Sequence, residues 1–162
     1  MTSSTSPSLS WRARRLHARQ SGVGLIEVLI AVLVLSIGFL GIAALQAMSM
    51  STNNSAMARS MATVASYSIM DAMRADILSA RGGNYNGKVT ANACGSASTT
   101  LADNQLRQWC NQLGATLGAA ATTTGEIQCQ GTGDCTVTIQ FDDSRAGVGG
   151  SNAQKVITKA ML

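Results

Sequence analysis

Apolar and polar positions divide the chain into a long apolar run, a striped segment and a mixed remainder. Between Val28 and Leu45 the only polar side chain is that of Ser36. About 20 helical residues cover the ~30 Å hydrocarbon core of a bilayer, so this run is long enough to span a membrane. The pattern therefore predicts a helix that begins at Val23 and spans a membrane over about residues 23–47.

The helix is expected to continue well beyond the apolar run. No Pro follows Pro7, and the next Gly after Gly41 is Gly82. Ala and Met, both good helix formers, are frequent up to Arg81. Six apolar residues recur every four positions and predict one apolar stripe: Met57, Met61, Ala65, Ile69, Met73 and Ile77. We predict one helix from Val23 to about Ala80, on the order of 85 Å long at ~1.5 Å per residue.

Turn residues and alternation organise the remainder of the chain. The Gly-rich stretch 82–87 ends the long helix, and a loop with a short strand at its start follows it. A second helix is predicted over 101–120, with a cap at Thr100 and with Trp109 in the core. Strands are predicted over 126–129, 135–141 and 154–162, in a small antiparallel sheet.

The net charge of +4 is a property of the first 22 residues alone. The four excess positive charges are all arginines of that segment: Arg12, Arg14, Arg15 and Arg19. Basic residues that flank an apolar helix mark its cytoplasmic end. The remainder of the chain is neutral, which gives no support for direct nucleic-acid binding.

Glu27 is the exception to the apolar pattern. It is the only charged residue between Arg19 and Arg59. A carboxylate near the start of a membrane helix is costly and normally has a partner, but no basic residue follows within reach on the same helix. Glu27 is therefore expected either to stay at the level of the headgroups or to pair with another chain.

The stretch from Gly22 to Leu29, Gly-Val-Gly-Leu-Ile-Glu-Val-Leu, resembles the class III signal of type IV prepilins. The resemblance implies that a prepilin peptidase cuts after Gly22 and methylates the new N-terminus at Val23. It also implies that Glu27, the fifth mature residue, pairs with the N-terminal amine of a neighbouring subunit. Val23 and Gly24 depart from the usual Phe and Thr of this signal.

Weaker similarities point to minor pilins of the PilV type. They lie in Ala65–Ala75, which contains Met-Asp-Ala-Met-Arg-Ala, and in Phe141–Arg145, which reads Phe-Asp-Asp-Ser-Arg. The resemblance implies a role in priming the pilus or forming its tip complex, in twitching motility and in adhesion. The implied partners are other minor pilins, the major pilin, a tip adhesin, the prepilin peptidase and the inner membrane.

The predicted fold is α+β and of the type IV pilin class: a long N-terminal helix packed on a small disulfide-stapled head with a second helix and an antiparallel sheet. We expect a cleaved leader over 1–22, the long helix over 23–81 and the head over 82–162. Before assembly the head is expected in the periplasm and the leader in the cytoplasm, and after assembly the protein is expected in the pilus at the cell surface.

Four cysteines are predicted to lie on the outer side of the membrane, where disulfides stabilise small domains. They allow three pairings. We favour Cys129–Cys135, which would bracket a hairpin, and Cys94–Cys110, which would tie the loop to the second helix. A four-cysteine zinc site is the alternative, and the lack of any Cys-x-x-Cys pair disfavours it.

Adjacent carboxylates at Asp142 and Asp143 could bind calcium together with Asp134, serve as acid and base, or cap a turn that ends a strand, and the turn is favoured. The only His is His17, in the expected leader. The mature chain therefore has no catalytic triad, cofactor loop or metal-ligand cluster, and we expect neither an enzyme nor a cofactor nor a small-molecule substrate.

Three alternatives remain open. A conventional secretory signal would be cut near Ala47. A minor pseudopilin of type II secretion would have nearly the same N-terminus. A single-pass anchored extracytoplasmic binding domain would keep its leader and would tolerate the loss of Glu27.

Overall fold

The computed structural model describes residues 22–146 and 149–162 and divides the chain into two compact units. The first unit ends at Gly41 and the second runs from Ile42 to Leu162. Helix α1, Leu25–Ala75, contributes residues to both units. The division falls within α1, whereas the sequence led us to place the boundary of the head at residues 81 and 82. The second half of α1 is part of the core of the head.

The apolar stripe predicted on α1 is confirmed at its centre and wrong at its ends. Ala65, Ile69 and Met73 are buried, but Met57 is 59% exposed and Ile77 is 36% exposed. A helix advances about 100° per residue, so residues four apart drift by about 40° at each step and cannot all share one face. Each buried residue of α1 instead has another one three, four or seven positions away, which keeps them on one face of the helix: Ser55, Ala62, Ala65, Ser66, Ile69, Met70 and Met73.

The long helix ends earlier than predicted. α1 stops at Ala75, and a separate helix α2 follows as Ile77–Arg81. Asp76 between them has φ −127° and ψ 53°, which is outside the helical region. Its carboxylate lies 3.2 Å from the hydroxyl of the buried Tyr85, a tertiary contact that sequence periodicity does not report.

Four antiparallel strands form one sheet in the order β1-β2-β3-β4, as the sequence predicted in outline. The strands are β1 Gly87–Thr90, β2 Thr124–Cys129, β3 Asp134–Phe141 and β4 Gln154–Met161. β3 alternates buried and half-buried positions after its exposed first residue, which confirms its predicted half-buried character. β1 and β4 are the edge strands of this sheet.

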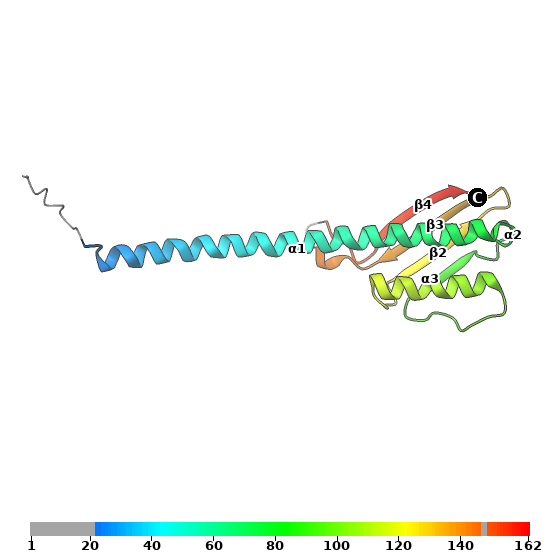
Figure 1. Cartoon of the computed structure of the whole chain (residues 1–162), viewed down its shortest axis with the longest axis horizontal. Coiled ribbons are helices and arrows are strands. Elements are labelled where there is room, and N and C mark those ends of the chain that lie inside the picture. The colour runs from blue at the N-terminus through cyan, green and yellow to red at the C-terminus, as the bar shows by residue number, and fades with distance from the viewer. Residues whose placement is uncertain (1–21, 147–148) are drawn as a thin grey trace, which may run out of the picture. The chain divides into compact units, whose positions relative to one another are not determined.

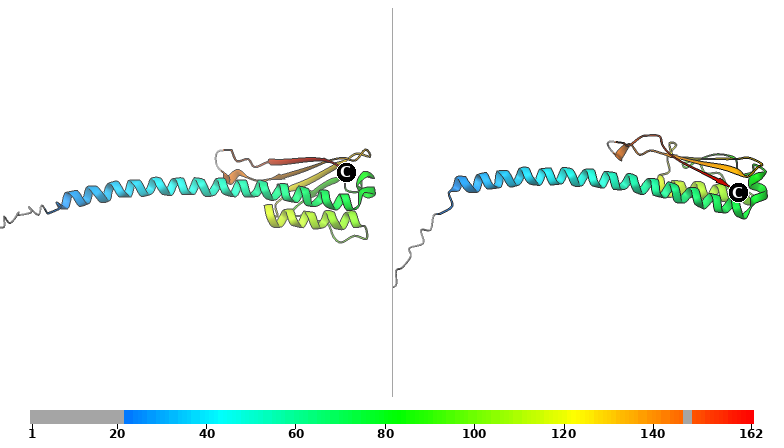
Figure 2. Two further views of the ribbon diagram at one scale, coloured as in Figure 1. Left: turned by 45° about the horizontal axis from the view of Figure 1, so that its top comes forward. Right: turned by 90° about the horizontal axis from the view of Figure 1, so that it is seen from above.

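Helix α3, Leu101–Leu117, packs on the same face of the sheet as the second half of α1 (Figures 1 and 2). It starts as predicted, with Thr100 Oγ1 accepting the backbone N–H of Asp103 at 3.2 Å. It ends three residues before the predicted end because Gly118 has φ +100°, a conformation that favours glycine.

Trp109 joins the layers of the head, and its prediction as a core residue is confirmed. The side chain is 3% exposed, and its Nε1–H donates to the carbonyl of Ala65 in α1 at 2.9 Å. Its ring lies so close to Gly125 of β2 that a Cβ there would collide with it. The glycine therefore permits the close approach of α3 to the sheet.

Candidate functional site

The first candidate site is the N-terminal segment around the predicted cleavage point. Gly22, Val23 and Gly24 precede α1, and Glu27 lies in its first turn. The carbonyl of Gly24 accepts the N–H of Glu27 at 2.9 Å, so the helix begins directly after this glycine. Residues 1–21, which include the four leader arginines and His17, lie outside the described residues.

None of the described residues requires glycine at position 22 or at position 24. A Cβ at Gly22 would meet no atom within 4 Å, and one at Gly24 would make only an ordinary contact, at 3.8 Å with Ile26. Neither residue has the positive φ that would demand glycine. Within the described residues, glycine at position 22 therefore has no structural explanation.

Glu27 forms no ion pair within the described residues, where the two ion pairs are Arg59–Asp143 and Arg74–Asp71. It is exposed, as are all the described residues of the first unit. The described part of the chain therefore supplies no cation to this carboxylate.

The apolar side chains that follow Glu27 are exposed in the same way. Val32, Ile37 and Leu40 are 55%, 64% and 72% exposed. The most apolar 18-residue window of α1 has a mean hydropathy of 2.9, and none of it is buried. By length and composition α1 is able to cross a membrane, and this segment near the N-terminus has no apolar partner in the described chain.

The prokaryotic N-terminal methylation motif matches residues 17–43, which include the Gly22–Glu27 segment and most of the apolar run. This match supports a type IV pilin-like protein. The long N-terminal helix and the small head with a four-stranded antiparallel sheet and two disulfides are consistent with the type IV pilin fold. No curated protein and no solved structure matches the chain.

The motif and the fold together suggest a structural rather than an enzymatic protein. The same motif supports a membrane-anchored pilin that is later assembled, and it implies that a prepilin peptidase acts on the chain. Within residues 22–146 and 149–162, no three His, Cys, Asp or Glu side chains are grouped so that they could hold a metal ion.

The cysteines of the pilin-like head are paired as favoured from the sequence. Cys94 is bonded to Cys110 and Cys129 to Cys135. The second bond joins residues directly opposite each other in β2 and β3, so it closes the hairpin. All four sulfur atoms are used, which is incompatible with a zinc site at these residues in the oxidised protein.

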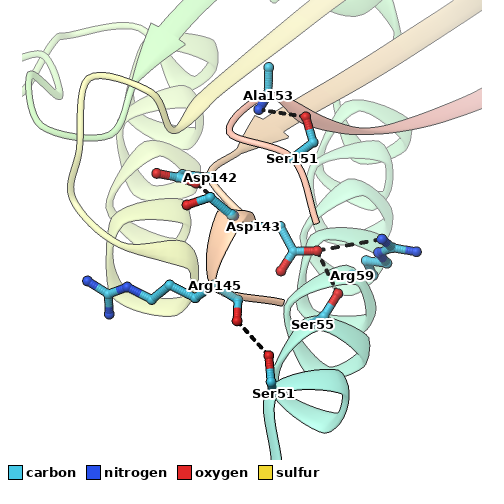
Figure 3. Close-up of polar contacts among 9 residues, drawn as sticks. Ser51, Ser55, Arg59, Asp142, Asp143, Arg145, Ser151 and Ala153 are labelled. Atoms are coloured by element: carbon cyan, nitrogen blue, oxygen red, sulfur yellow. Dashed lines mark hydrogen bonds and ion pairs between the residues drawn. The ribbon is translucent and has the colours of Figure 1, made fainter. Parts of the chain in front are cut away.

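A second candidate site fastens the segment after β3 to α1 (Figure 3). Asp143 is 7% exposed, and its Oδ2 accepts the Ser55 hydroxyl at 2.5 Å and lies 3.5 Å from Arg59 Nη2. The Ser51 hydroxyl donates to the carbonyl of Arg145 at 2.5 Å. We call these contacts the α1 clasp: Ser51, Ser55, Arg59, Asp143 and Arg145.

The hydrogen bonds of Asp142 and Asp143 decide between the turn and the calcium site considered for these two carboxylates. Asp142 Oδ1 accepts the backbone N–H of Ser144 at 2.9 Å, so it caps the turn that begins the short 3₁₀ helix Ser144–Ala146. This hydrogen bond, helped by the charge of Arg145, holds the pKa of Asp142 below its usual range. The strand-ending turn is confirmed.

The calcium alternative is wrong in the form that joined both carboxylates to Asp134. Asp134 begins β3 and Asp142 follows its end, so the two are roughly 25 Å apart at ~3.3 Å per residue. Asp143 is committed to Ser55 and Arg59 instead. Sequence reasoning missed the clasp because its partners are 88 and 94 residues apart and carry no local signal.

Proposed function

We propose that the protein is a minor type IV pilin of the PilV type, made as a prepilin, cut after Gly22 and incorporated into a pilus. The observation that carries the proposal is the methylation motif over 17–43, placed on a helix segment whose apolar side chains are all exposed. The finer assignment to minor pilins rests on the similarities at 65–75 and 141–145.

The first step of the proposed mechanism is cleavage between Gly22 and Val23 at the cytoplasmic face of the inner membrane. The open surroundings of Gly22 support this step, because a peptidase needs unhindered access to the peptide bond. Val23, which is 70% exposed, then becomes the methylated N-terminus. Removal of residues 1–22 takes away the four arginines that hold the leader in the cytoplasm.

The second step pairs Glu27 with the N-terminal amine of a neighbouring subunit during assembly. The exposed carboxylate, which has no ion-pair partner in the described chain, supports this pairing. Once the helix leaves the lipid for a bundle of helices, the pair is desolvated. An unpaired charge left in such a bundle costs about 3–5 kcal/mol.

The third step is packing of the apolar segment against other helices. Gly38 and Gly41 support it, because a Cβ at either position would meet nothing in this chain. Glycine inside a helix costs about 1 kcal/mol relative to alanine, a cost that close helix approach can offset. The partners in this step are the major pilin and other minor pilins, and a tip adhesin would lie above them.

The test compares Glu27→Gln with a matched control, Glu126→Gln in β2, whose carboxylate lies in the head. Each variant is expressed in cells that lack the wild-type protein, and its amount is measured in membranes and in sheared filaments. We expect Glu27→Gln to remain in membranes while its amount in filaments falls by at least about tenfold, since a charge pair is lost. Glu126→Gln should reach filaments as the wild type does.

Two outcomes would reject this function. Equal filament content for Glu27→Gln and the wild type would remove the proposed pairing. Absence of the wild-type protein from filaments, with a secretion defect but normal twitching in a deletion strain, would assign it to a type II secretion pseudopilin. The methylation motif is equally compatible with that alternative.

A further inference from the structure

A cavity of about 470 Å³ lies in the head, and none of its lining residues belongs to the clasp or to the N-terminal segment. It is lined by the edge strand β1, by Ala93 and residues 95–98 of the loop that joins β1 to α3, and by one side of α3. This volume is in the range of ordinary ligand sites, about 300–1,000 Å³.

The walls of the cavity are fixed before any ligand arrives. Cys94 is bonded to Cys110 of α3. Four residues further on, Ser98 accepts from Asn104 Nδ2 at 2.6 Å through its carbonyl and donates its N–H to Asn104 Oδ1 at 3.2 Å. The loop is thus pinned to α3 on both sides of the segment 95–97, which forms one wall. Such preorganisation lowers the entropic cost of binding.

The charges around the cavity favour an anion. Lys88 and Arg107 line it, and Asp103 is its only carboxylate within the described residues. The Asp103 carboxylate accepts the Ser98 hydroxyl at 2.7 Å. Its pKa is lowered by hydrogen bonds from Thr100 and Ser98, so it is ionised and already engaged by the protein.

Both cations lack a protein acceptor in the part of the chain that the structure describes. Arg107 Nε is buried and has no hydrogen-bond partner there, which is uncommon for a buried donor. Glu126 lies opposite Lys88 in β2, but it accepts from Gln128 at 2.7 Å and forms no ion pair with the lysine. A guanidinium with no carboxylate partner is suited to bidentate binding of a carboxylate from elsewhere.

The remaining lining residues narrow the ligand class. No aromatic side chain lines the cavity, so a sugar ring would find no stacking surface. Val89 and Leu106 offer apolar contact for a short aliphatic stem. We propose that this cavity binds the carboxylate side chain of an acidic peptide segment presented by a partner protein, and that Arg107 and Lys88 bind this carboxylate. The inference does not rest on cleavage or on the pairing of Glu27.

The experiment titrates the full chain in detergent micelles by calorimetry with the peptide acetyl-Ala-Glu-Leu-Ala-amide. The matched probe is the same peptide with Gln in place of Glu. We expect the Glu peptide to bind at least about tenfold more tightly, because only it carries the charge that Arg107 and Lys88 attract. Its affinity should fall with rising salt.

Variants assign the effect to the cavity. Arg107→Gln should weaken Glu-peptide binding by about tenfold. Arg107→Lys should weaken it by less, because lysine keeps the positive charge but cannot donate the two parallel hydrogen bonds of a guanidinium. Lys88→Gln should weaken binding by a few-fold, and its exposed position makes misfolding no concern. Lys155→Gln, on the exposed face of β4 outside the cavity, is the control and should bind as the wild type does.

Three results would overturn the proposal. The first is equal binding of the Glu and Gln peptides. The second is unchanged binding after Lys88→Gln and after a folded Arg107→Gln, judged by an unchanged circular dichroism spectrum. The third is competition by acetate or inorganic phosphate at the same concentration as the peptide, which would make the cavity a general anion site.

Discussion

Helix α1 contains two segments that use apolar side chains in opposite ways. Residues 25–41 expose every one of them, whereas residues 62–73 bury Ala62, Ile69, Met70 and Met73 against the sheet and α3. Both segments are helical, so secondary structure does not explain the difference. The second segment has its partner in the same chain, and the first must find lipid or other helices. One helix therefore carries both the anchor and a wall of the head.

Two isoleucines on α1 test this comparison with the largest expected effect. Ile69 is 2% exposed and Ile37 is 64% exposed. Ile69→Ala should lower the free energy of unfolding of the head by about 2–5 kcal/mol, because it leaves a cavity in a packed core. Ile37→Ala should leave it unchanged. Urea unfolding in detergent, followed by Trp109 fluorescence, measures both, and equal losses would break the comparison.

The two disulfides test how far the head that buries the second segment of α1 depends on covalent bonds for its stability. The bond Cys94–Cys110 spans 16 residues and Cys129–Cys135 spans 6. By loop-closure entropy, replacing the first pair with Ser should cost about 3 kcal/mol and the second about 2 kcal/mol. The free energies of unfolding of the two double variants give the order. A reversed order would show that loop entropy is not the main effect.

A pH titration separates the buried phenol of the head from an exposed one on α1. Burial, with the charge of Asp76 as a smaller cause, raises the pKa of Tyr85 from 10.0 to about 12. The folded head therefore holds this proton more tightly than the unfolded chain. The resulting stability is complete below about pH 10 and is lost as the pH rises toward 12.

The measurement is the difference in unfolding free energy between pH 10 and 12 for the wild type and for Tyr85→Phe. The wild type should lose roughly 2–3 kcal/mol more than the variant, since one pKa unit corresponds to about 1.4 kcal/mol. Tyr67→Phe, at a side chain that is 54% exposed, is the control and should follow the wild type. Parallel curves for all three proteins would contradict the assignment.

The α1 clasp gives the smallest expected change. Asp143→Ala leaves Ser55 and Arg59 without their acceptor and should lower the unfolding free energy by about 1–3 kcal/mol. Asp71→Ala removes an exposed pair with Arg74 at 2.7 Å and should cost less than about 0.5 kcal/mol. The same urea titration compares them. Equal losses of unfolding free energy in the two variants would mean that the buried contacts of Asp143 stabilise the head no more than an exposed ion pair does.

Most of the fold could be predicted because its signals are local. Alternation identified β3, and the residues Thr100 and Gly82 marked helix ends. The predicted hairpin and the predicted link between a loop and the second helix favoured the observed cysteine pairs. The break at Asp76 was missed because no Gly or Pro marks it in the sequence, although the backbone there leaves the helical region. The six-residue stripe was too long because a spacing of four drifts around a helix.

The candidate sites also differ in whether local sequence signals could predict them. The segment 22–27 could be recognised because its chemistry lies in consecutive residues, and the motif match covers it. The clasp and the cavity could not be predicted, because each joins residues brought together only by tertiary structure. Ser55 and Arg107 have no sequence context that distinguishes them from other surface residues of their helices.

The most direct test of the central claim is the intact mass of the protein purified from membranes, with and without the prepilin peptidase. The account predicts a chain that begins at methylated Val23 only when the peptidase is present, and a chain that keeps residues 1–22 when it is absent. A chain that keeps Gly22 in the presence of active peptidase, or one cut near Ala47, would contradict the account.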